Sequence, residues 1–279
     1  MSNDFWSLAA ARHRNRPLVI GHRGAAGLCP ENTLASIHRA AEVGADAVEL
    51  DIRASVEGEP VIIHDATLER TTNGHGPVSE HSLADLAERD AGWHWHADDS
   101  TTPDWRGQGL RIPTLESVLR ESPLPMVLEI KQENLDLVER VGSMIMDHDR
   151  QHDALVVSFS RTVMRHFRQR FPQMATGSSV RELVWFQILA RLGLARLFPP
   201  PGLALQTRWY WRGLDQVSPA MLRRAHTLGH PVHVWTINDA AQMRELCRRG
   251  VDGIITDYPQ RLAQVLQSPA NPARGGDFE

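Results

Sequence analysis

The chain has 279 residues, 42% of them hydrophobic and 23% charged, which is the composition of an ordinary globular protein with enough apolar residues for a sizeable core. Its formal charge of −4 provides no chain-wide positive field, which argues against a general nucleic-acid-binding protein. The two cysteines, Cys29 and Cys247, have no metal-site spacing, so a disulfide framework and a structural zinc site are disfavoured and a reducing compartment is favoured.

The first 16 residues form a polar, arginine-containing extension before the first apolar run. They lack the basic start and the long apolar stretch of a secretion signal. No part of the sequence has the roughly 20 consecutive apolar residues that cross a membrane. We therefore expect a cytoplasmic protein with a short N-terminal extension, residues 1–16.

The first predicted strand, residues 18–21, ends at a histidine and an arginine, His22 and Arg23. Glycines in the following stretch permit tight turns, and Pro30 predicts the start of a helix because proline is tolerated in a first helical turn. Gly44 then predicts the end of that helix. A strand, a turn and a helix thus follow one another at the start of the barrel-forming chain.

Two further extended runs follow, at residues 47–52 and 60–64. Only about seven residues separate them, which is too few for the crossover that parallel neighbours need, so we expect an antiparallel hairpin. With a two-residue turn at positions 57 and 58, the register predicts that Asp51 lies opposite His64.

Residues 65–113 lack a regular pattern apart from one short helix, which we expect to be capped near Ser79 or Ser82. Connections of this length are uncommon unless they form lids or binding loops. The segment also contains three tryptophans, which favour a small inserted subdomain folded over part of the molecule. They are Trp93, Trp95 and Trp105.

From residue 114 onward, helical and extended patterns alternate regularly. Together with the strands at 18–21 and 47–52, they predict an α/β fold, a (β/α)8 TIM barrel over residues 17–268 with a small inserted subdomain at 65–113. The tail, residues 269–279, is expected to be disordered. The later strands are predicted at 126–130, 154–159, 173–177, 203–207, 232–236 and 253–256, and the helices at 114–121, 133–149, 161–171, 180–197, 218–228, 239–249 and 259–267.

Carboxylates gather at the predicted strand ends. Residues two apart on a strand share a face, so Glu49 points with Asp51, and Glu129 points with Lys131. Three carboxylates at one barrel mouth repel one another unless a cation lies among them. A single hard divalent ion, Mg²⁺ or Ca²⁺, is the natural candidate because both ions prefer oxygen ligands.

The remaining polar groups indicate phosphate chemistry. Arg23 and Lys131 carry the two charge types that pair well with phosphate oxygens. His22 and His64 supply an acid–base pair, because two histidines near neutrality can hold opposite protonation states. Either histidine can be the acid, and the attacking group can be water or a hydroxyl of the substrate itself, which would form a cyclic phosphate.

Nine short motifs along the chain resemble those of the glycerophosphodiester phosphodiesterase family, within the wider group of phospholipase-C-like phosphodiesterase barrels. The matching motifs follow the family order from residue 19 to 259, so the resemblance covers nearly the whole chain. A lone HRG is weak evidence, whereas this ordered set is highly specific. The motifs are GHRG (21–24), PENT (30–33), VELDIR (48–53), PVIIHD (60–65), TLERTTNG (67–74), IPTLESVL (112–119), LEIK (128–131), VWTIND (234–239) and GVDGIITDYP (250–259).

The resemblance implies a metal-dependent phosphodiesterase that hydrolyses glycerophosphodiesters, as small-molecule substrates, to glycerol 3-phosphate and an alcohol. It implies that the segment 65–113 is the family's inserted subdomain. It also implies a role for each site residue: Glu49, Asp51 and Glu129 as metal ligands, His22 and His64 as the acid–base pair, Arg23 and Lys131 as phosphate contacts, and Trp235 as a wall for the alcohol.

Three other residues can have either a structural or a functional role. Glu31 and Asn32 fit either the start of a helix, where free backbone donors need acceptors, or a supporting position behind the substrate, and we place them behind the site. Asp257 follows the last strand and either faces the site or stabilises the turn after it.

The segment 178–213 departs from the family, because it is more apolar and richer in tryptophan than a minimal member needs. Residues 183–198 are interrupted by Arg191 and Arg196, which predicts an amphipathic helix and not a membrane span. We prefer an outer barrel helix. The alternative is a weak membrane-surface or lysolipid contact through residues 183–211, with lysophospholipase D-type hydrolysis of lysophospholipids.

Two further alternatives concern the reaction itself. A lysine at a barrel strand end can form a Schiff base, so Lys131 would suit a lyase, although the carboxylates argue against it. A non-catalytic phosphoglycerol-binding protein would normally lack one catalytic group, and every expected group is present here.

Overall fold

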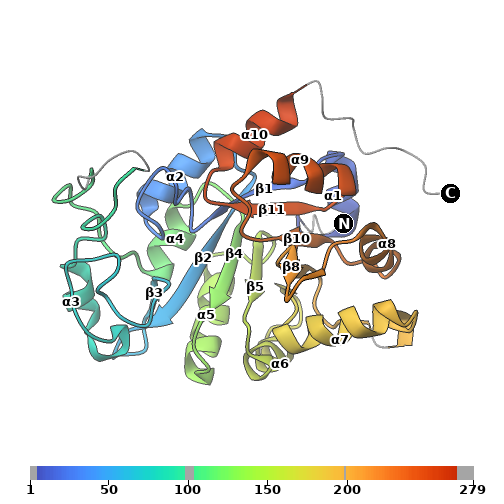
Figure 1. The fold of residues 1–279 in the computed structure, drawn as a ribbon. Helices are drawn as coiled ribbons and strands as arrows, with labels where there is room; N and C mark the ends of the chain where they lie inside the picture. The colour runs from blue at the N-terminus through green and yellow to red at the C-terminus, as the bar shows by residue number, and fades with distance from the viewer. Residues whose placement is uncertain (1–4, 98–103, 198, 269–279) are drawn as a thin grey trace.

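The computed structural model describes residues 5–97, 104–197 and 199–268, and within them eight parallel strands form one curled sheet surrounded by helices (Figure 1). The strands pair in the order β6-β5-β4-β2-β1-β11-β10-β7, and a parallel bridge between Gly177 and Ala204 joins the two ends. The predicted (β/α)8 barrel is confirmed. The strands are β1 (Leu18–His22), β2 (Ala47–Ala54), β4 (Met126–Ile130), β5 (Ala154–Val157), β6 (Ala175–Thr176), β7 (Leu205–Thr207), β10 (Val232–Val234) and β11 (Gly253–Thr256).

The helices bury one apolar face each against the outside of the sheet, which forms the larger core. They lie close to their predicted positions, although α2 begins after Thr33 and not at Pro30. Thr33 Oγ1 accepts the backbone N–H of Ser36, so threonine caps the helix and proline remains in the turn before it. The helices are α2 (Leu34–Glu42), α4 (Leu115–Glu121), α5 (Leu135–Asp147), α6 (Arg161–Arg170), α7 (Val180–Arg191), α8 (Pro219–Thr227), α9 (Ala240–Arg249) and α10 (Pro259–Gln267).

The N-terminal extension has a packing role that the sequence did not indicate. It forms α1 (Leu8–Arg14), capped by Ser7, and Trp6 just before it is 1% exposed. Trp6 packs with the apolar residues inside the barrel, including Leu18 and Ile20 at the start of β1. The extension therefore closes the barrel at the N-terminal ends of its strands.

The antiparallel hairpin is present, but its predicted register is wrong by one residue. β3 (Pro60–Ile62) pairs with β2 so that Ile52 faces Ile62, and the N–H of Ile63 donates to the carbonyl of Asp51. The turn has three residues between Ser55 and Glu59, and the last of them, Gly58, has φ +80. This longer turn sets Asp51 opposite Ile63, and His64 follows just beyond the strand.

The segment 65–113 contains a 3₁₀ turn, η1 (Val78–Glu80), and α3 (Leu83–Ala87), which is capped by Ser82 as predicted. Its apolar side chains form a separate small cluster with residues of the β3 strand. Residues 98–103 of this segment and the tail 269–279 lie outside the described residues, so the subdomain and the disordered tail stay predictions.

The region after α7 differs from the predicted continuous helix over 180–197. The helix ends at Arg191, and a 3₁₀ turn, η2 (Ala195–Leu197), follows after Gly193, which has φ +75. A two-stranded hairpin of β8 (Tyr210–Trp211) and β9 (Leu214–Asp215) was not predicted. Its strands have two residues each and are too short to produce a visible alternation.

Candidate active site

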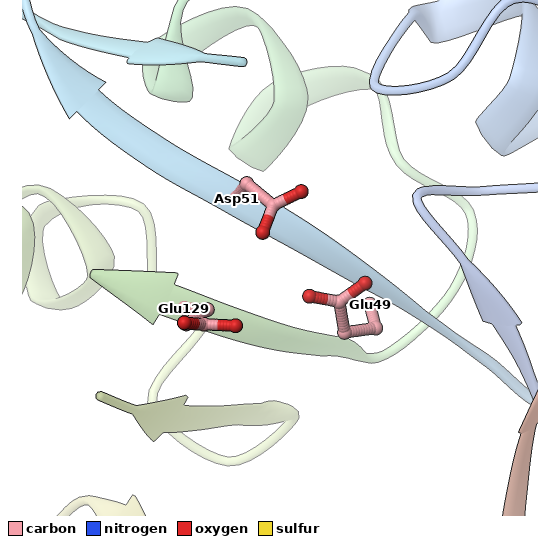
Figure 2. A group of neighbouring side chains, drawn as sticks. All are labelled: Glu49, Asp51 and Glu129. Atoms are coloured by element: carbon pink, nitrogen blue, oxygen red, sulfur yellow. The ribbon is translucent and has the colours of Figure 1, made fainter. Parts of the chain in front are cut away.

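The three carboxylates come together at the C-terminal ends of neighbouring strands. Glu49 and Asp51 lie on β2, and Asp51 pairs with Glu129 on β4 in the strand register. One ligand oxygen from each lies within 4.8 Å of the others, and Figure 2 shows the three groups turned toward one another. This is the cluster that the period of two along each strand predicted.

The electrostatics of the cluster favour a bound cation. Burial and the neighbouring Asp51 raise the pKa of Glu49 to about 8, and burial also raises the pKa of Glu129. Burial pushes the pKa of Asp51 upward as well, but Arg23 and Lys131 outweigh this effect and the pKa is lowered. Oxygen ligands of this kind fit a hard divalent ion, whose charge would keep Glu49 ionised at neutral pH.

Two protein cations border the carboxylates. Lys131 Nζ lies 3.0 Å from Glu129 Oε1 and 3.3 Å from Asp51 Oδ1. Arg23 Nε lies 3.2 Å from Asp51 Oδ2, but this buried N–H makes no aligned hydrogen bond. A phosphate oxygen in the cavity is the type of acceptor that both groups can still take.

The turn that presents Arg23 requires glycine beside it. Arg23 itself has φ +51, and Gly24 has φ +85. A Cβ on Gly24 would lie 2.2 Å from Ser36 Oγ, so a side chain there would collide with the start of α2. The close approach of turn and helix explains the glycine after His22-Arg23.

The side chain of His22 is oriented by Asp257, which directly follows the last strand, β11. Its Nδ1 lies 2.6 Å from Asp257 Oδ1, and Asn238 Nδ2 donates to the other oxygen of Asp257 at 2.6 Å. With Nδ1–H donating to the carboxylate, Nε2 faces the cavity, 3.9 Å from Glu49 Oε2. Burial lowers the pKa of His22, but Asp257 and Glu49 outweigh burial and the pKa is raised.

His64 is held in a similar way and lines the same cavity. Its Nδ1 lies 2.6 Å from Asp65 Oδ1, and Arg70 Nε donates to Asp65 Oδ2 at 2.5 Å. Burial lowers the pKa of His64, and Asp65 offsets this only in part. Each histidine is therefore oriented by a carboxylate through Nδ1, which leaves Nε2 for a substrate.

Glu31 and Asn32 are not helix caps. Glu31 accepts from Arg23 Nη1 at 2.7 Å and from both Nη atoms of Arg70, so it links the two arginines. Asn32, with φ +57, donates its side-chain amide to Asp51 Oδ2 at 2.9 Å and accepts the Asp51 N–H. Both residues thus contact groups that line the cavity, and their supporting role stays a prediction.

All the residues predicted to act on metal or substrate line one cavity of about 630 Å³. Trp235 is among them, and its ring stacks on Phe159 with centroids 5.9 Å apart. The cavity continues beyond these rings along α7 to the hairpin of β8 and β9. The residues common to prediction and cavity are His22, Arg23, Glu49, Asp51, His64, Glu129, Lys131 and Trp235.

Sequence reasoning missed four contributors: Asp65, Arg70, Phe159 and Asn238. Asp65 follows His64 directly, so the HD pair was a signal that could have been used. Phe159 continues the inward face of β5 two residues beyond Val157, which the period of two could have indicated. Arg70 and Asn238 lie in loops, where no periodicity indicates the direction of a side chain. Their places in the motifs TLERTTNG and VWTIND were the signal that could have been used.

The family model for the glycerophosphoryl diester phosphodiesterase family matches residues 22–261. A glycerophosphodiester phosphodiesterase of Bacillus subtilis is 31% identical over 90% of this chain and 87% of its own length. The structure of an Oleispira antarctica phosphodiesterase in complex with the product sn-glycerol-3-phosphate is 28% identical, with a TM-score of 0.71 over 92% of this chain and 99% of that one. A rat lysophospholipase D is 24% identical over 89% of this chain and 86% of its length. The chain belongs to the glycerophosphoryl diester phosphodiesterase family.

Proposed function

We propose that this protein is a divalent-metal-dependent phosphodiesterase that hydrolyses glycerophosphodiesters to glycerol 3-phosphate and an alcohol. One observation carries the proposal: three carboxylates, two cations and two oriented histidines line a single cavity. The product named in the Oleispira antarctica structure supports glycerol 3-phosphate as the shared half of the substrate.

Glu49, Asp51 and Glu129 would hold one Mg²⁺ or Ca²⁺ ion. When bound, such an ion supplies charge stabilisation at the phosphoryl group and lowers the pKa of a coordinated hydroxyl. Asn32 fixes the carboxylate of Asp51 with two hydrogen bonds, which limits its rotation away from the cluster.

His22 and His64 act as the acid–base pair. Their Nδ1 atoms are bound to Asp257 and Asp65, so each imidazole presents Nε2 to the cavity in a fixed orientation. One takes the proton of the attacking hydroxyl, and the other gives a proton to the departing alcohol oxygen.

Arg23 and Lys131 bind the phosphate oxygens, and Trp235 borders the alcohol. Lys131 is a poor candidate for a Schiff base. Burial lowers its pKa, but Asp51 and Glu129 outweigh burial and the pKa is raised, whereas an amine nucleophile needs a lowered value. The lyase reading therefore has less support than hydrolysis.

Our proposals for the cellular compartment and for the inserted subdomain have limited structural support. Among the described residues, no helix has the length and apolar character needed to cross a bilayer. Cys29 and Cys247 are buried outside any disulfide, which supports a reducing compartment, the cytoplasm. The small cluster over the β3 strand supports an inserted subdomain at 65–113.

The reaction can be tested with glycerophosphocholine. We expect glycerol 3-phosphate and choline as products, with activity lost in chelator and restored by Mg²⁺ or Ca²⁺. Release of phosphocholine, or turnover that persists in chelator, would contradict the proposal. Borohydride trapping of a carbonyl-containing substrate as an imine on Lys131 would instead support the lyase.

A further inference from the structure

Exposed apolar side chains are concentrated in one region of the surface. Of the large apolar residues exposed in the described part of the chain, all except Val56 and Leu135 lie between residues 159 and 214. Most of them lie on α7, on the turn after it and on the hairpin of β8 and β9, well away from α3 in Figure 1. Monomeric proteins rarely expose a large contiguous apolar surface unless it binds something.

The outward face of α7 is apolar, although the helix lies at the surface. Phe186 and Ala190 face the core, where both are buried. The opposite stripe of the helix, at spacings of four, three and four residues, contains three large apolar side chains that are all exposed. A surface helix ordinarily has polar side chains at such positions. The stripe consists of Arg181, Trp185, Ile188 and Leu192.

The turn after α7 and the hairpin of β8 and β9 extend this apolar face. Leu192 and Leu197 are each 66% exposed, the highest value among the large apolar residues of the described chain. The hairpin lies against α7, because Arg191 Nη2 donates to the carbonyl of Asp215 at 3.2 Å. We define the α7 patch as the exposed side chains of Trp185, Ile188, Leu192, Leu197, Trp211 and Leu214.

The α7 patch is accompanied by arginines. Residues 180–215 contain five arginines, all of them exposed, although the whole chain has a net charge of −4. The two acids in this range are both paired with arginines outside it, Glu182 with Arg168 at 2.8 Å and Asp215 with Arg249 at 2.6 Å. The region is therefore locally positive on a chain that is negative overall. The five arginines are Arg181, Arg191, Arg196, Arg208 and Arg212.

This combination fits an anionic lipid surface better than a second copy of the chain. In a symmetric dimer the same patch meets itself, so the arginines of the two copies would face and repel one another. At a bilayer surface, leucine side chains enter the boundary of the hydrocarbon, tryptophan and tyrosine lie at the level of the head groups, and arginines attract anionic lipids. Tyr210 and Trp211 on the hairpin are both exposed, as this arrangement requires.

We propose that the α7 patch binds the surface of a bilayer that contains anionic phospholipids. The contact is peripheral, since no helix among the described residues has the length and apolar character to cross a bilayer. Ile188, Trp211 and Leu214 also line the active-site cavity, so docking places one edge of that cavity beside the bilayer. The proposal concerns the location of the protein and does not depend on the proposed phosphodiesterase activity.

The test is co-sedimentation of the unmodified protein with vesicles of phosphatidylcholine, with and without about one third phosphatidylglycerol. We expect partitioning onto the anionic vesicles to be at least about tenfold stronger. The difference should shrink as sodium chloride rises from about 0.05 M to about 0.5 M, because salt screens the arginines. Equal partitioning onto both kinds of vesicle, or none onto either, would overturn the proposal.

Leu192→Ser and Arg196→Gln test the two components of the contact. The first should lower the partition coefficient onto anionic vesicles about tenfold by removing a buried apolar side chain, and the second about fivefold by removing one charge. Val56→Ser and Arg120→Gln are the matched controls, because both side chains lie outside the patch and are 58% and 63% exposed. Equal losses in the controls would overturn the assignment to α7.

Neither Leu192 nor Arg196 lines the cavity, so turnover of glycerophosphocholine and the unfolding temperature should match those of the unmodified protein. Sedimentation equilibrium without lipid tests the other occupant. A concentration-dependent dimer that Leu192→Ser abolishes would overturn the bilayer in favour of a second copy. Vesicle binding without any turnover would refute the proposed function and still support this inference.

Discussion

The two ends of the barrel are built from the same strands but have opposite character. At the N-terminal end, the inward residues of β1 and β4 are apolar, as in Ile20 and Val127. Two residues further along each strand, the inward positions are His22 and Glu129. One end is sealed by Trp6, and the other opens into the cavity. The comparison shows that stability and chemistry are separated along each strand by a single step of two residues.

Burial shifts a pKa at both ends, with different consequences. At the sealed end, burial lowers the pKa of His233 to about 4, so this histidine stays neutral. At the open end, burial and Asp51 raise the pKa of Glu49 to about 8. A bound cation would offset the free-energy cost of ionising Glu49. It would not stabilise a charged His233. The sealed end is therefore stable with His233 neutral, whereas the carboxylates of the open end form a group that could hold the metal ion proposed above.

The largest predicted effect at the open end is the loss of turnover in the variants His22→Ala and His64→Ala. Each should lower kcat for glycerophosphocholine by about a thousandfold, because each would remove one of the two proposed proton-transfer groups. The unfolding temperature should change little, since both side chains face the cavity. His152→Ala, on the exposed surface, is the control. Near-normal kcat in either cavity variant would show that the replaced histidine does not transfer a proton in the reaction.

Trp6→Ala should have the opposite profile. Removing a side chain that is 1% exposed should lower the free energy of unfolding by about 3–5 kcal/mol. At temperatures well below unfolding, kcat/KM should stay unchanged because Trp6 lies at the far end of the barrel. Urea unfolding and steady-state kinetics measure the two quantities. A catalytic defect with unchanged stability would reverse the assignment of the two ends.

Asp257→Asn should produce an intermediate effect at the open end. The amide can no longer orient His22 through Nδ1 as the carboxylate does at 2.6 Å, so kcat should fall about tenfold to a hundredfold with little change in KM. Asp136→Asn, at an exposed position on α5, is the matched control. A change in KM alone would mean that Asp257 contributes to binding and not to the orientation of His22.

The smallest effect concerns pH and the sealed end. The pKa of His233 is lowered from 6.5 to about 4, so only the unfolded chain takes up this proton between those values. The stabilisation is complete above pH 6.5 and declines as the pH falls toward 4. Between pH 7 and 5 the loss should be on the order of 1–2 kcal/mol. Urea unfolding of His233→Gln should show a shallower decline, and an equal decline would exclude His233 as its source.

The sequence predicted the features that depend on periodicity. Alternation along β2 and β4 indicated that Glu49, Asp51 and Glu129 share one face, and the strand register brings them within 4.8 Å. The repeated change between strand and helix likewise predicted the barrel. Such features follow from local patterning, because a period of two or 3.6 fixes which face a side chain takes.

Features that depend on turn geometry or on contacts distant in sequence were not predictable in this way. One extra residue in the hairpin turn shifted the partner of Asp51 from His64 to Ile63. Asp257 was ambiguous because its contact with His22 joins residues that are 235 positions apart in the sequence, although β1 and β11 are neighbouring strands. Trp6 appeared to belong to a polar extension, since nothing local shows that its ring enters the barrel.

The central claim is that Glu49, Asp51 and Glu129 form the site of one divalent ion at the open end. Calorimetric titration of the chelator-treated enzyme with Mg²⁺ or Ca²⁺ tests it most directly, alongside Glu129→Gln. We predict that one ion binds per chain, that binding raises the unfolding temperature, and that the variant loses both effects. Equal ion binding by the variant and the unmodified enzyme would contradict the claim.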